Sequence, residues 1–453
     1  MKVEQYDVVV VGGGPSGVMA AVQSARAGAK TLLIERGGFL GGSLTMMGVS
    51  PMMTFHNPGG DQVVFGLAQE LVDKLIAMDA SPGHVIDSIT YCSTVTPFDA
   101  EAMKIAMETM VIDAGADILY HSMLASVSFD QSRVQKVTVC NKAGLVDIVG
   151  QYFIDATGDG DLANQAGIMQ KKGRETDEAT QPMTMNLKIS GVDVDRIRED
   201  VYANPDNYEF DLGVEEGIKR LKETKRLSLK AFSKTWPAYR DQHQLGIPRE
   251  FILFFETNEP GTVVCNSSRI QGMDGTNPFD MTRAEVEGRR QCYEIFKFLK
   301  SEAIGFENAR LVSTPYQVGV RETRRSIGDY VLTASDLLEQ RPFDDVVAFG
   351  AYPIDIHSPD KIETVSTHLQ PDHVYNIPMR TLFTGKVDNL VFSGRSISAD
   401  HEAFAAIRVT PIAMSIGQAS GAVAAVAARH HCAVNRVPYE EVKQALKENG
   451  VRL

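Results

Sequence analysis

Three glycines near the start of the chain stand where a phosphate-binding turn needs them. Gly12, Gly14 and Gly17 follow a β-branched run at residues 6–11 and precede an alanine-rich stretch at residues 18–27. Between a strand and a helix, such glycines allow a tight turn, close approach of the backbone to a pyrophosphate, and close helix–strand packing. The helix N-terminus adds unpaired N–H groups and the positive end of the helix dipole. The spacing therefore predicts a dinucleotide site.

A carboxylate follows the second strand of the same unit. We expect that strand at residues 30–34, and Glu35 ends it. A carboxylate at this point accepts hydrogen bonds from ribose hydroxyls and repels a 2′-phosphate, which disfavours NADP. The predicted nucleotide-binding residues therefore include Glu35 and its neighbour Arg36, together with Pro15 and Ser16 of the turn.

The elements that must position these residues predict an α/β fold. Apolar periodicity favours helices near residues 63–78 and 98–114, with strands expected at 116–127, 134–141 and 145–154. A more highly charged middle segment is expected to hold strands near 183–190 and 250–266 and a long helix near 282–302. The last third is apolar and glycine-rich again and contains a small-residue helix, roughly 411–428.

The length of 453 residues favours more than one domain. We predict a Rossmann-like nucleotide-binding domain with a three-layer, parallel sheet, built from residues 1–168 and 345–453. Residues 169–344 are expected to form an inserted α+β substrate domain.

Composition excludes several classes of partner. The formal charge is −13 and the sequence has no block of basic residues, which argues against nucleic-acid or anionic-membrane binding. No run of about 18 apolar residues predicts a membrane span, and the N-terminus shows no secretory signal, so we expect a cytoplasmic protein. The five cysteines are far apart, without iron–sulfur or zinc spacing, and we predict no metal site.

Further motifs extend the nucleotide-binding pattern along the chain. They are Gly41-Gly42 with Thr45, DATGDGD at 155–161, GVRETRRSIGDYVLT at 319–333, YPIDIH at 352–357, and GRSISADHEAFAAIRVTPIAMSIGQASG at 394–421. With these motifs the sequence resembles the FAD-dependent oxidoreductases of the glutathione-reductase structural class. More closely, it resembles bacterial members related to fumarate-reductase flavoproteins and to the flavin module of heterodisulfide reductase. The resemblance covers nearly the whole chain and implies FAD as the cofactor.

The resemblance also implies a role for each matching position near the nucleotide. Gly12, Gly14 and Gly17 would hold the FAD pyrophosphate and Glu35 the adenosine ribose. The remaining contacts on this side would come from Gly42 and Thr45, from Ala156, Thr157 and Gly158, and from a backbone amide near Leu124 or Ala125 that meets adenine.

The C-terminal motif would approach the flavin. The resemblance implies that Gly394 and Arg395 lie near the phosphates and the ribityl chain. Pro411, Ile416 and Gly417 belong to a segment that would present a helix N-terminus to the flavin ring near N1 and O2. There the helix dipole favours the negative charge of reduced flavin.

Candidate catalytic residues cluster in the later motifs. The wider set is Arg321, Arg324, Tyr352, Asp355, His357, Arg395, His401, Glu402 and Arg408. Within it, His357 could act as a general base, and Arg321 could hold a substrate carboxylate. His401 and Arg408 flank the segment expected beside the flavin. The alternative for each is structural, such as a loop histidine with a hydrogen bond or an arginine paired with Glu322.

Missing motifs narrow the reaction. Two neighbouring cysteines after the second strand, a second glycine fingerprint and iron–sulfur cysteines are all absent. We therefore expect a small-molecule substrate that exchanges a hydride with flavin N5. The alternatives are an electron-transfer subunit of a larger redox complex and a non-redox flavoprotein. The sequence leaves open a redox partner protein, a homo-oligomer, the electron acceptor and covalent attachment of FAD.

Overall fold

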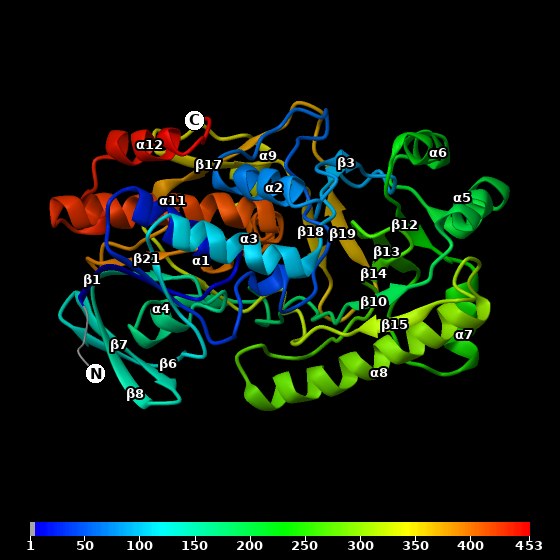
Figure 1. The fold of residues 1–453 in the computed structure, drawn as a ribbon, viewed down its shortest axis with the longest axis horizontal. Helices are drawn as coiled ribbons and strands as arrows, with labels where there is room; N and C mark the ends of the chain where they lie inside the picture. Colours follow the sequence, from blue (N-terminus) through cyan, green and yellow to red (C-terminus); the bar gives the residue numbers. More distant parts are fainter. Residues whose placement is uncertain (1–4) are drawn as a thin grey trace.

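The computed structural model describes residues 5–453, which fold into two units lying side by side along the long axis of the molecule (Figure 1). One unit takes its residues from both ends of the chain, and the other from the middle. The predicted fold class, an α/β protein with a parallel sheet and an inserted α+β unit, is confirmed.

A parallel sheet forms the centre of the first unit. β1 (Gln5–Val11) lies between β2 (Thr31–Ile34) and β8 (Gly144–Asp155), and β5 (Asp117–Leu119) and β21 (Leu390–Phe392) pair with those neighbours. The β-branched run of β1 is buried on both faces, as expected for the middle of a parallel sheet.

An antiparallel meander extends one side of this sheet. β6 (Met123–Asp130) pairs with β7 (Arg133–Asn141), which pairs with the first half of β8. The predicted single strand at residues 116–127 is wrong, because the backbone turns at His121, where φ is 51°. The turn separates β5, which is parallel to β2, from β6, which is antiparallel to β7.

Helices of this unit pack on the parallel sheet, on one another or on the short strands. They are α1 (Pro15–Arg26), α2 (Leu67–Ala77), α3 (Ala100–Asp113), α4 (Asp161–Gln165), α9 (Ala334–Leu338), α10 (His401–Ile407), α11 (Thr410–His430) and α12 (Tyr439–Glu448). Figure 1 shows α11 as a long helix through this unit. It packs on α1 with almost no space between the backbones, since a Cβ on Gly417 would lie 2.1 Å from the Ser16 carbonyl oxygen.

Helix α11 is long and apolar enough to cross a membrane by length and composition alone. Of its most apolar window, 89% is buried inside the protein, as in the core helix of a soluble domain. Its small residues thus serve packing against α1.

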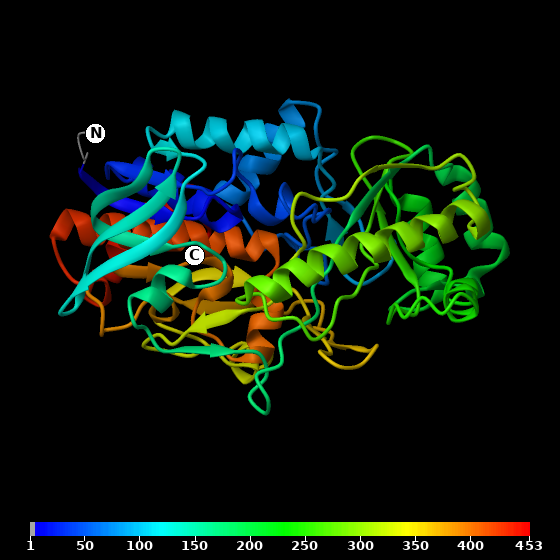
Figure 2. The same cartoon turned by 90° about the horizontal axis from the view of Figure 1, so that it is seen from below.

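An antiparallel sheet organises the inserted unit. Its strand order is β11 (Tyr208–Glu209), β12 (Ser228–Ala231), β13 (Ile252–Glu256), β14 (Val263–Cys265), β10 (Leu187–Ser190) and β15 (Arg310–Ser313). Its helices are α5 (Val194–Ala203), α6 (Val214–Glu223), α7 (Thr235–Gln242) and α8 (Pro278–Glu302). Helix α8 runs along this unit and reaches toward the first one (Figure 2).

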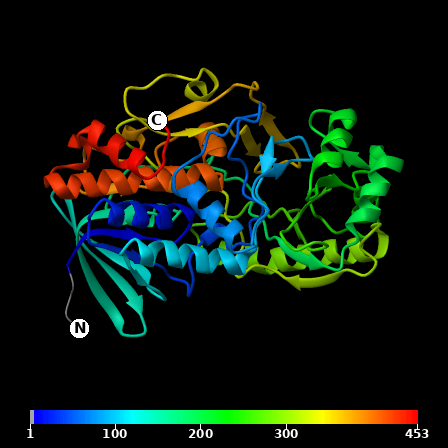
Figure 3. The ribbon, with the colours of Figure 1, turned by 45° about the horizontal axis from the view of Figure 1, so that its top comes forward.

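Short strand pairs lie outside the two main sheets. They are β3 (Val85–Ile86) with β4 (Thr94–Val95), β9 (Gln170–Lys172) with β16 (Arg324–Ser326), β17 (Val346–Gly350) with β20 (Tyr375–Pro378), and β18 (Ile354–His357) with β19 (Thr364–Thr367). The β18–β19 hairpin lies at the junction of the units (Figure 1). The C-terminus lies on the first unit (Figure 3).

Two separate hydrophobic cores underlie this organisation. The first takes residues from 6–168 and again from Leu332 onward, and the second from 183–320. Trp236 is fully buried in the second core and contacts Phe298 edge-on. The predicted domain limits at residues 168 and 344 stay a prediction.

Candidate functional site

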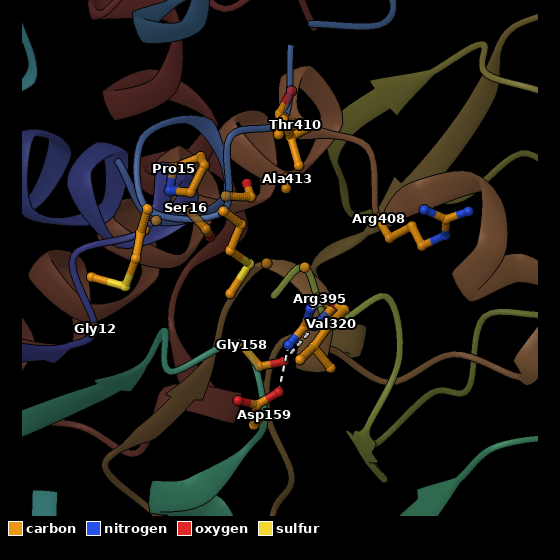
Figure 4. A pocket seen from close by; sticks show the side chains of 18 of the residues that line it. Gly12, Pro15, Ser16, Gly158, Asp159, Val320, Arg395, Arg408, Thr410 and Ala413 are labelled. Atoms are coloured by element: carbon orange, nitrogen blue, oxygen red, sulfur yellow. Dashed lines mark hydrogen bonds and ion pairs between the residues drawn. The ribbon is translucent and has the colours of Figure 1, made fainter. Parts of the chain in front are cut away.

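A cavity of about 550 Å³ lies where the two units meet. Figure 4 shows the glycine turn, with Gly12, Pro15 and Ser16, on one side of this cavity and Arg408 on the other. We call these sides the dinucleotide end and the substrate end. Both ends belong to one continuous space, because the same cavity is lined by residues of the parallel sheet, the β18–β19 hairpin and the inserted sheet.

Backbone crowding explains the glycines of the dinucleotide end. Gly12 has φ of +108°, and a Cβ there would lie 2.3 Å from the Ala156 carbonyl oxygen. A Cβ on Gly17 would lie only 1.8 Å from the Gly12 carbonyl oxygen. A Cβ on Gly14 would meet nothing within 4 Å, and Gly14 lines the cavity at the N-terminus of α1. Gly12 and Gly17 are thus required by packing, whereas Gly14 leaves room for a ligand.

Glu35 joins the end of β2 to the glycine turn. Its Oε2 accepts a hydrogen bond from the Gly13 amide at 2.7 Å, and its Oε1 accepts one from the Gly37 amide at 2.6 Å. The side chain is buried and lines the cavity. Each oxygen retains a second lone pair that can accept from a ribose hydroxyl.

Arg395 closes the opposite wall of the dinucleotide end. Its Nε donates to the Gly158 carbonyl oxygen at 2.7 Å, and its terminal nitrogens bond the Val320 carbonyl oxygen and the Asp159 carboxylate (Figure 4). This guanidinium is therefore neutralised within the protein before any ligand binds.

Helix α11 reaches the cavity with its first turn only. Thr410 and Ala413 line the cavity, and Figure 4 shows both on its upper side. Gly417 lies one turn further along and faces Ser16 of α1. The positive end of the helix dipole is thus directed at the cavity.

The structure brings most of the predicted site residues together. Lining the cavity are Gly12, Gly14, Pro15, Ser16, Glu35, Arg36, Gly42, Ala156, Thr157, Gly158, Arg321, His357, Gly394, Arg395 and Arg408. Outside its lining are Gly17, Thr45, Ala125, His401, Pro411, Ile416 and Gly417. Thr45 donates to the Leu40 carbonyl oxygen at 2.7 Å, and Ala125 is exposed while its neighbour Leu124 lines the cavity.

His401 lies in a buried polar cluster behind the cavity. Its Nδ1 lies 2.8 Å from Glu322 Oε1, and the same carboxylate forms an ion pair with Arg325. Arg324 is also outside the cavity lining, and it donates to Oδ1 of the lining residue Asp161 at 2.8 Å. These contacts favour a structural role for both residues, which is the alternative to a catalytic role that the sequence left open.

Asp355 is the centre of the substrate end. His357 Nε2 lies 3.2 Å from Asp355 Oδ2, Arg408 donates to the same oxygen at 3.3 Å, and the Tyr352 hydroxyl donates to it at 3.4 Å. Burial alone would raise the pKa of the Asp355 carboxyl, but His357 and Arg408 bring it well below its usual range. Asp355 is therefore ionised and fixes the orientation of its three partners.

His357 is held neutral. Burial and the nearby Arg321 guanidinium lower the pKa of His357 to about 3, although Asp355 acts in the opposite direction. Its Nδ1 lies 3.2 Å from Thr364 Oγ1 and 3.4 Å from a terminal nitrogen of Arg269. With Nε2–H donated to Asp355, Nδ1 carries the lone pair, and the Arg269 guanidinium and the Thr364 hydroxyl lie where they can donate to it.

Several residues of the substrate end carry no motif in the sequence. Thr184, Asn186, Phe255 and Asn266 line the cavity from the inserted unit. Each is isolated in the sequence, and the inserted sheet alone brings them together. A hydrogen bond from Asn186 Nδ2 to the Gly48 carbonyl oxygen, at 3.0 Å, fixes that amide and leaves its buried Oδ1 without a partner.

The residues at the dinucleotide end fit FAD. Gly14 supplies open space at a helix N-terminus for a pyrophosphate, and Glu35 supplies acceptors for a ribose. The first turn of α11 supplies a positive dipole for the electron-rich side of a flavin. Among residues 5–453, no group of three or more His, Cys, Asp or Glu side chains is placed to hold a metal ion.

Curated relatives match part of the chain. Thiamine thiazole synthase of Aeropyrum pernix is 34% identical over 163 residues, covering 34% of this chain and 54% of that protein. Soluble pyridine nucleotide transhydrogenase of Mycobacterium bovis is 30% identical over 162 residues, covering 34% of this chain and 31% of that protein. The chain thus spans about half or less of the length of these relatives.

Solved structures resemble the chain over most of its length but at low similarity. A geranylgeranyl bacteriochlorophyll reductase-like protein from Thermoplasma acidophilum has a TM-score of 0.45 and 14% identity, covering 98% of this chain and 83% of that one. Anhydrotetracycline hydroxylase from Streptomyces rimosus has a TM-score of 0.45 and 12% identity, covering 98% and 66%.

The family comparison is decisive because it spans nearly the whole chain. A family model described as FAD dependent oxidoreductase matches residues 7–446, which include the glycine turn, the inserted unit and the first turn of α11. The chain therefore belongs to the FAD dependent oxidoreductase family, and its cofactor is FAD.

Proposed function

We propose that this FAD-dependent oxidoreductase transfers a hydride between a small organic substrate and the flavin. The observation that carries this proposal is the single cavity shared by the two ends. Residues that fit FAD and a set of polar side chains, including Tyr352, His357 and Arg408, line one continuous space. A protein that only passes electrons to a partner needs no such second set of oriented polar groups beside its cofactor.

Three side chains would orient the substrate and move its proton. Arg321 and Arg408 would bind and orient it, and the His357 imidazole would accept a proton when the substrate is oxidised. Asp355 would stabilise the resulting imidazolium, since it already lies 3.2 Å from Nε2. Bound FAD supplies the hydride acceptor, N5 of its ring.

The structure of the cavity wall supports exclusion of water. Met46, Met47 and Met53 line the cavity from the segment that follows the glycine-rich turn after β2. Flexible apolar side chains of this kind adapt to a ligand and cover it.

We also propose a relation to fumarate-reductase flavoproteins and to the flavin module of heterodisulfide reductase. The motif at residues 394–421 supports it.

An anaerobic visible spectrum of the holoprotein tests the proposal. We expect the flavin bands to bleach when one member of a panel of alcohols, amines and carboxylic acids is added. His357→Gln should slow this bleaching about 100-fold, whereas His431→Gln, at an exposed residue after α11, should leave it unchanged. Flavin bands that no compound bleaches, but that a redox partner protein does, would replace the proposal with the electron-transfer alternative.

A further inference from the structure

Three arginines around the substrate end have no acidic partner. Arg249 and Arg269 are 7% and 2% exposed, and Arg321 is half-buried in the cavity wall. Among residues 5–453, no carboxylate oxygen lies within 4.0 Å of any of these guanidinium groups. A buried charge without a counter-charge is strongly unfavourable, so proteins rarely keep one without a function for it.

The partners that these arginines do have are neutral. Arg321 uses one terminal nitrogen, Nη1, to bond the Pro182 carbonyl oxygen and the Thr184 hydroxyl. Arg269 donates to three carbonyl oxygens of the β18–β19 turn, those of Ser358, Lys361 and Glu363, at 2.9–3.1 Å. These bonds satisfy donors but leave the positive charges in place.

The charges of these arginines act on one another. Burial lowers the pKa of Arg321, and the positive charges of Arg408, Arg249 and Arg269 lower it further, while Asp355 acts in the opposite direction. Asp355 is already shared by Arg408 and His357. Glu250 also acts on Arg249 and Arg269, and Glu209 on Arg249, but Asp355 is the carboxylate that acts on Arg321. The cavity wall at Arg321 therefore carries excess positive charge.

Two of the four guanidinium groups reach the cavity. Arg321 and Arg408 line it, and the Nε of Arg408 is buried without a hydrogen-bond partner. Figure 4 shows the Arg408 side chain across the cavity from the glycine turn. Arg395, at the other end, is already paired with Asp159, and Arg36 there is exposed to solvent, so the buried excess charge lies at the substrate end.

We propose that the substrate is a small carboxylic acid whose carboxylate binds between Arg321 and Arg408, with Arg249 and Arg269 adding positive potential from behind. This inference rests on the proposed function and names the substrate class for it. The planar fork of an arginine matches the two oxygens of a carboxylate. Binding would supply the counter-charge that the protein itself lacks.

Carboxylate binding would also act on His357. The positive charge of Arg321 is the second cause, after burial, of the low pKa of His357. A carboxylate on Arg321 offsets that charge and brings the pKa of His357 back toward its ordinary value. The groups that face or act on this ring are Arg321, Asp355, Arg408, Arg269 and Thr364.

The test compares acids with their amides on the wild-type holoprotein. Acetate, glycolate and benzoate, at matched ionic strength, are titrated against acetamide, glycolamide and benzamide, with the flavin spectrum and the unfolding temperature as readouts. We expect at least one acid to perturb the flavin bands and raise the unfolding temperature in a saturable way, and its amide to do neither. Equal responses to acid and amide, or none to any acid, would overturn the inference.

Variants locate the site. Arg321→Gln and Arg408→Gln should each weaken binding of the responding acid about 10- to 100-fold, with bound FAD retained. Arg290→Gln on α8, which removes an exposed arginine paired with Glu287, is the matched control and should bind normally. Loss of binding in the control, or normal binding in both cavity variants, would place the anion elsewhere. Inorganic phosphate, tested in parallel, should not compete at equal concentration, and if it competes as well as the acid the carboxylate assignment fails.

The two proposals fail separately. If an acid binds saturably but no compound bleaches the flavin bands, the carboxylate site is supported and the proposed hydride transfer is wrong. If neutral alcohols or amines bleach the flavin bands and no acid has an effect, hydride transfer is supported and the carboxylate site is wrong.

Discussion

The dinucleotide end satisfies its own polar groups, whereas the substrate end leaves positive charge unpaired. At the first, Arg395 is neutralised by Asp159, and both oxygens of Glu35 accept backbone N–H groups. At the second, Arg321 has only neutral partners. The difference teaches that the cofactor end is shaped by backbone geometry and the substrate end by electrostatics that a ligand must complete. Substitutions at the dinucleotide end should therefore lower stability or FAD affinity, whereas removal of the Arg321 charge at the substrate end should leave stability unchanged or raise it.

The largest effect is expected from the backbone geometry of the dinucleotide end. Gly17→Val places a side chain where a Cβ alone would lie 1.8 Å from the Gly12 carbonyl oxygen, so the turn must open. We expect a loss of at least about 3 kcal/mol of unfolding free energy, together with loss of FAD. Urea unfolding followed by circular dichroism, and the flavin absorbance of the purified protein, measure both.

Gly14→Ala is the matched control for this prediction. A Cβ at Gly14 meets nothing within 4 Å, and its φ of −71° is accessible to alanine. This variant should fold with a change below about 1 kcal/mol. If Gly14→Ala unfolded the protein as much as Gly17→Val, the separation of packing glycines from the ligand-facing glycine would be wrong.

The same division explains how much the sequence could predict. Gly12, Gly14 and Glu35 are within one strand–turn–helix–strand unit, so their spacing alone indicated the site, and the family model confirms the cofactor. Asn186, Asn266, Arg249 and Arg269 come from separate parts of the inserted unit, and only tertiary contacts bring them beside Arg321. The break at His121 was missed because its neighbours favour a strand on both sides.

The next largest effect concerns the affinity for FAD. Glu35→Ala removes the predicted ribose contact and leaves the Gly13 and Gly37 amides without their acceptor. We expect the Kd for FAD to rise about 10- to 100-fold, measured by quenching of flavin fluorescence on binding to the apoprotein. Glu70→Ala, at an exposed carboxylate paired with Arg26, serves as the control. An unchanged Kd for Glu35→Ala would show that Glu35 does not contribute a ribose contact to FAD binding.

His357 allows the electrostatics of the substrate end to be tested through pH. Its pKa in the folded protein is about 3, below the ordinary value of 6.5. Between these values the unfolded chain binds a proton that the folded protein does not, so stability falls as the pH falls through this window. At pH 5 the loss due to His357 should be about 2 kcal/mol.

His357→Gln should remove this part of the acid sensitivity. The difference in unfolding free energy between wild type and variant, measured at pH 7.5 and pH 5, should shift by that amount in favour of the variant. His431→Gln should show no such shift. A constant difference for His357→Gln would mean that the ring is not held neutral by burial and Arg321.

The smallest effect has the opposite sign and gives the sharpest contrast between the two ends. Arg321→Met removes an unpaired, half-buried charge, and without substrate it should leave stability unchanged or raise it by up to about 1 kcal/mol. Arg395→Met, the same substitution at the dinucleotide end, strands the Asp159 carboxylate and two carbonyl oxygens and should destabilise by about 2 kcal/mol. Thermal unfolding of both variants without added acids measures the contrast. Equal destabilisation would show that the protein already compensates the charge of Arg321, and the excess positive potential would no longer require an anionic substrate.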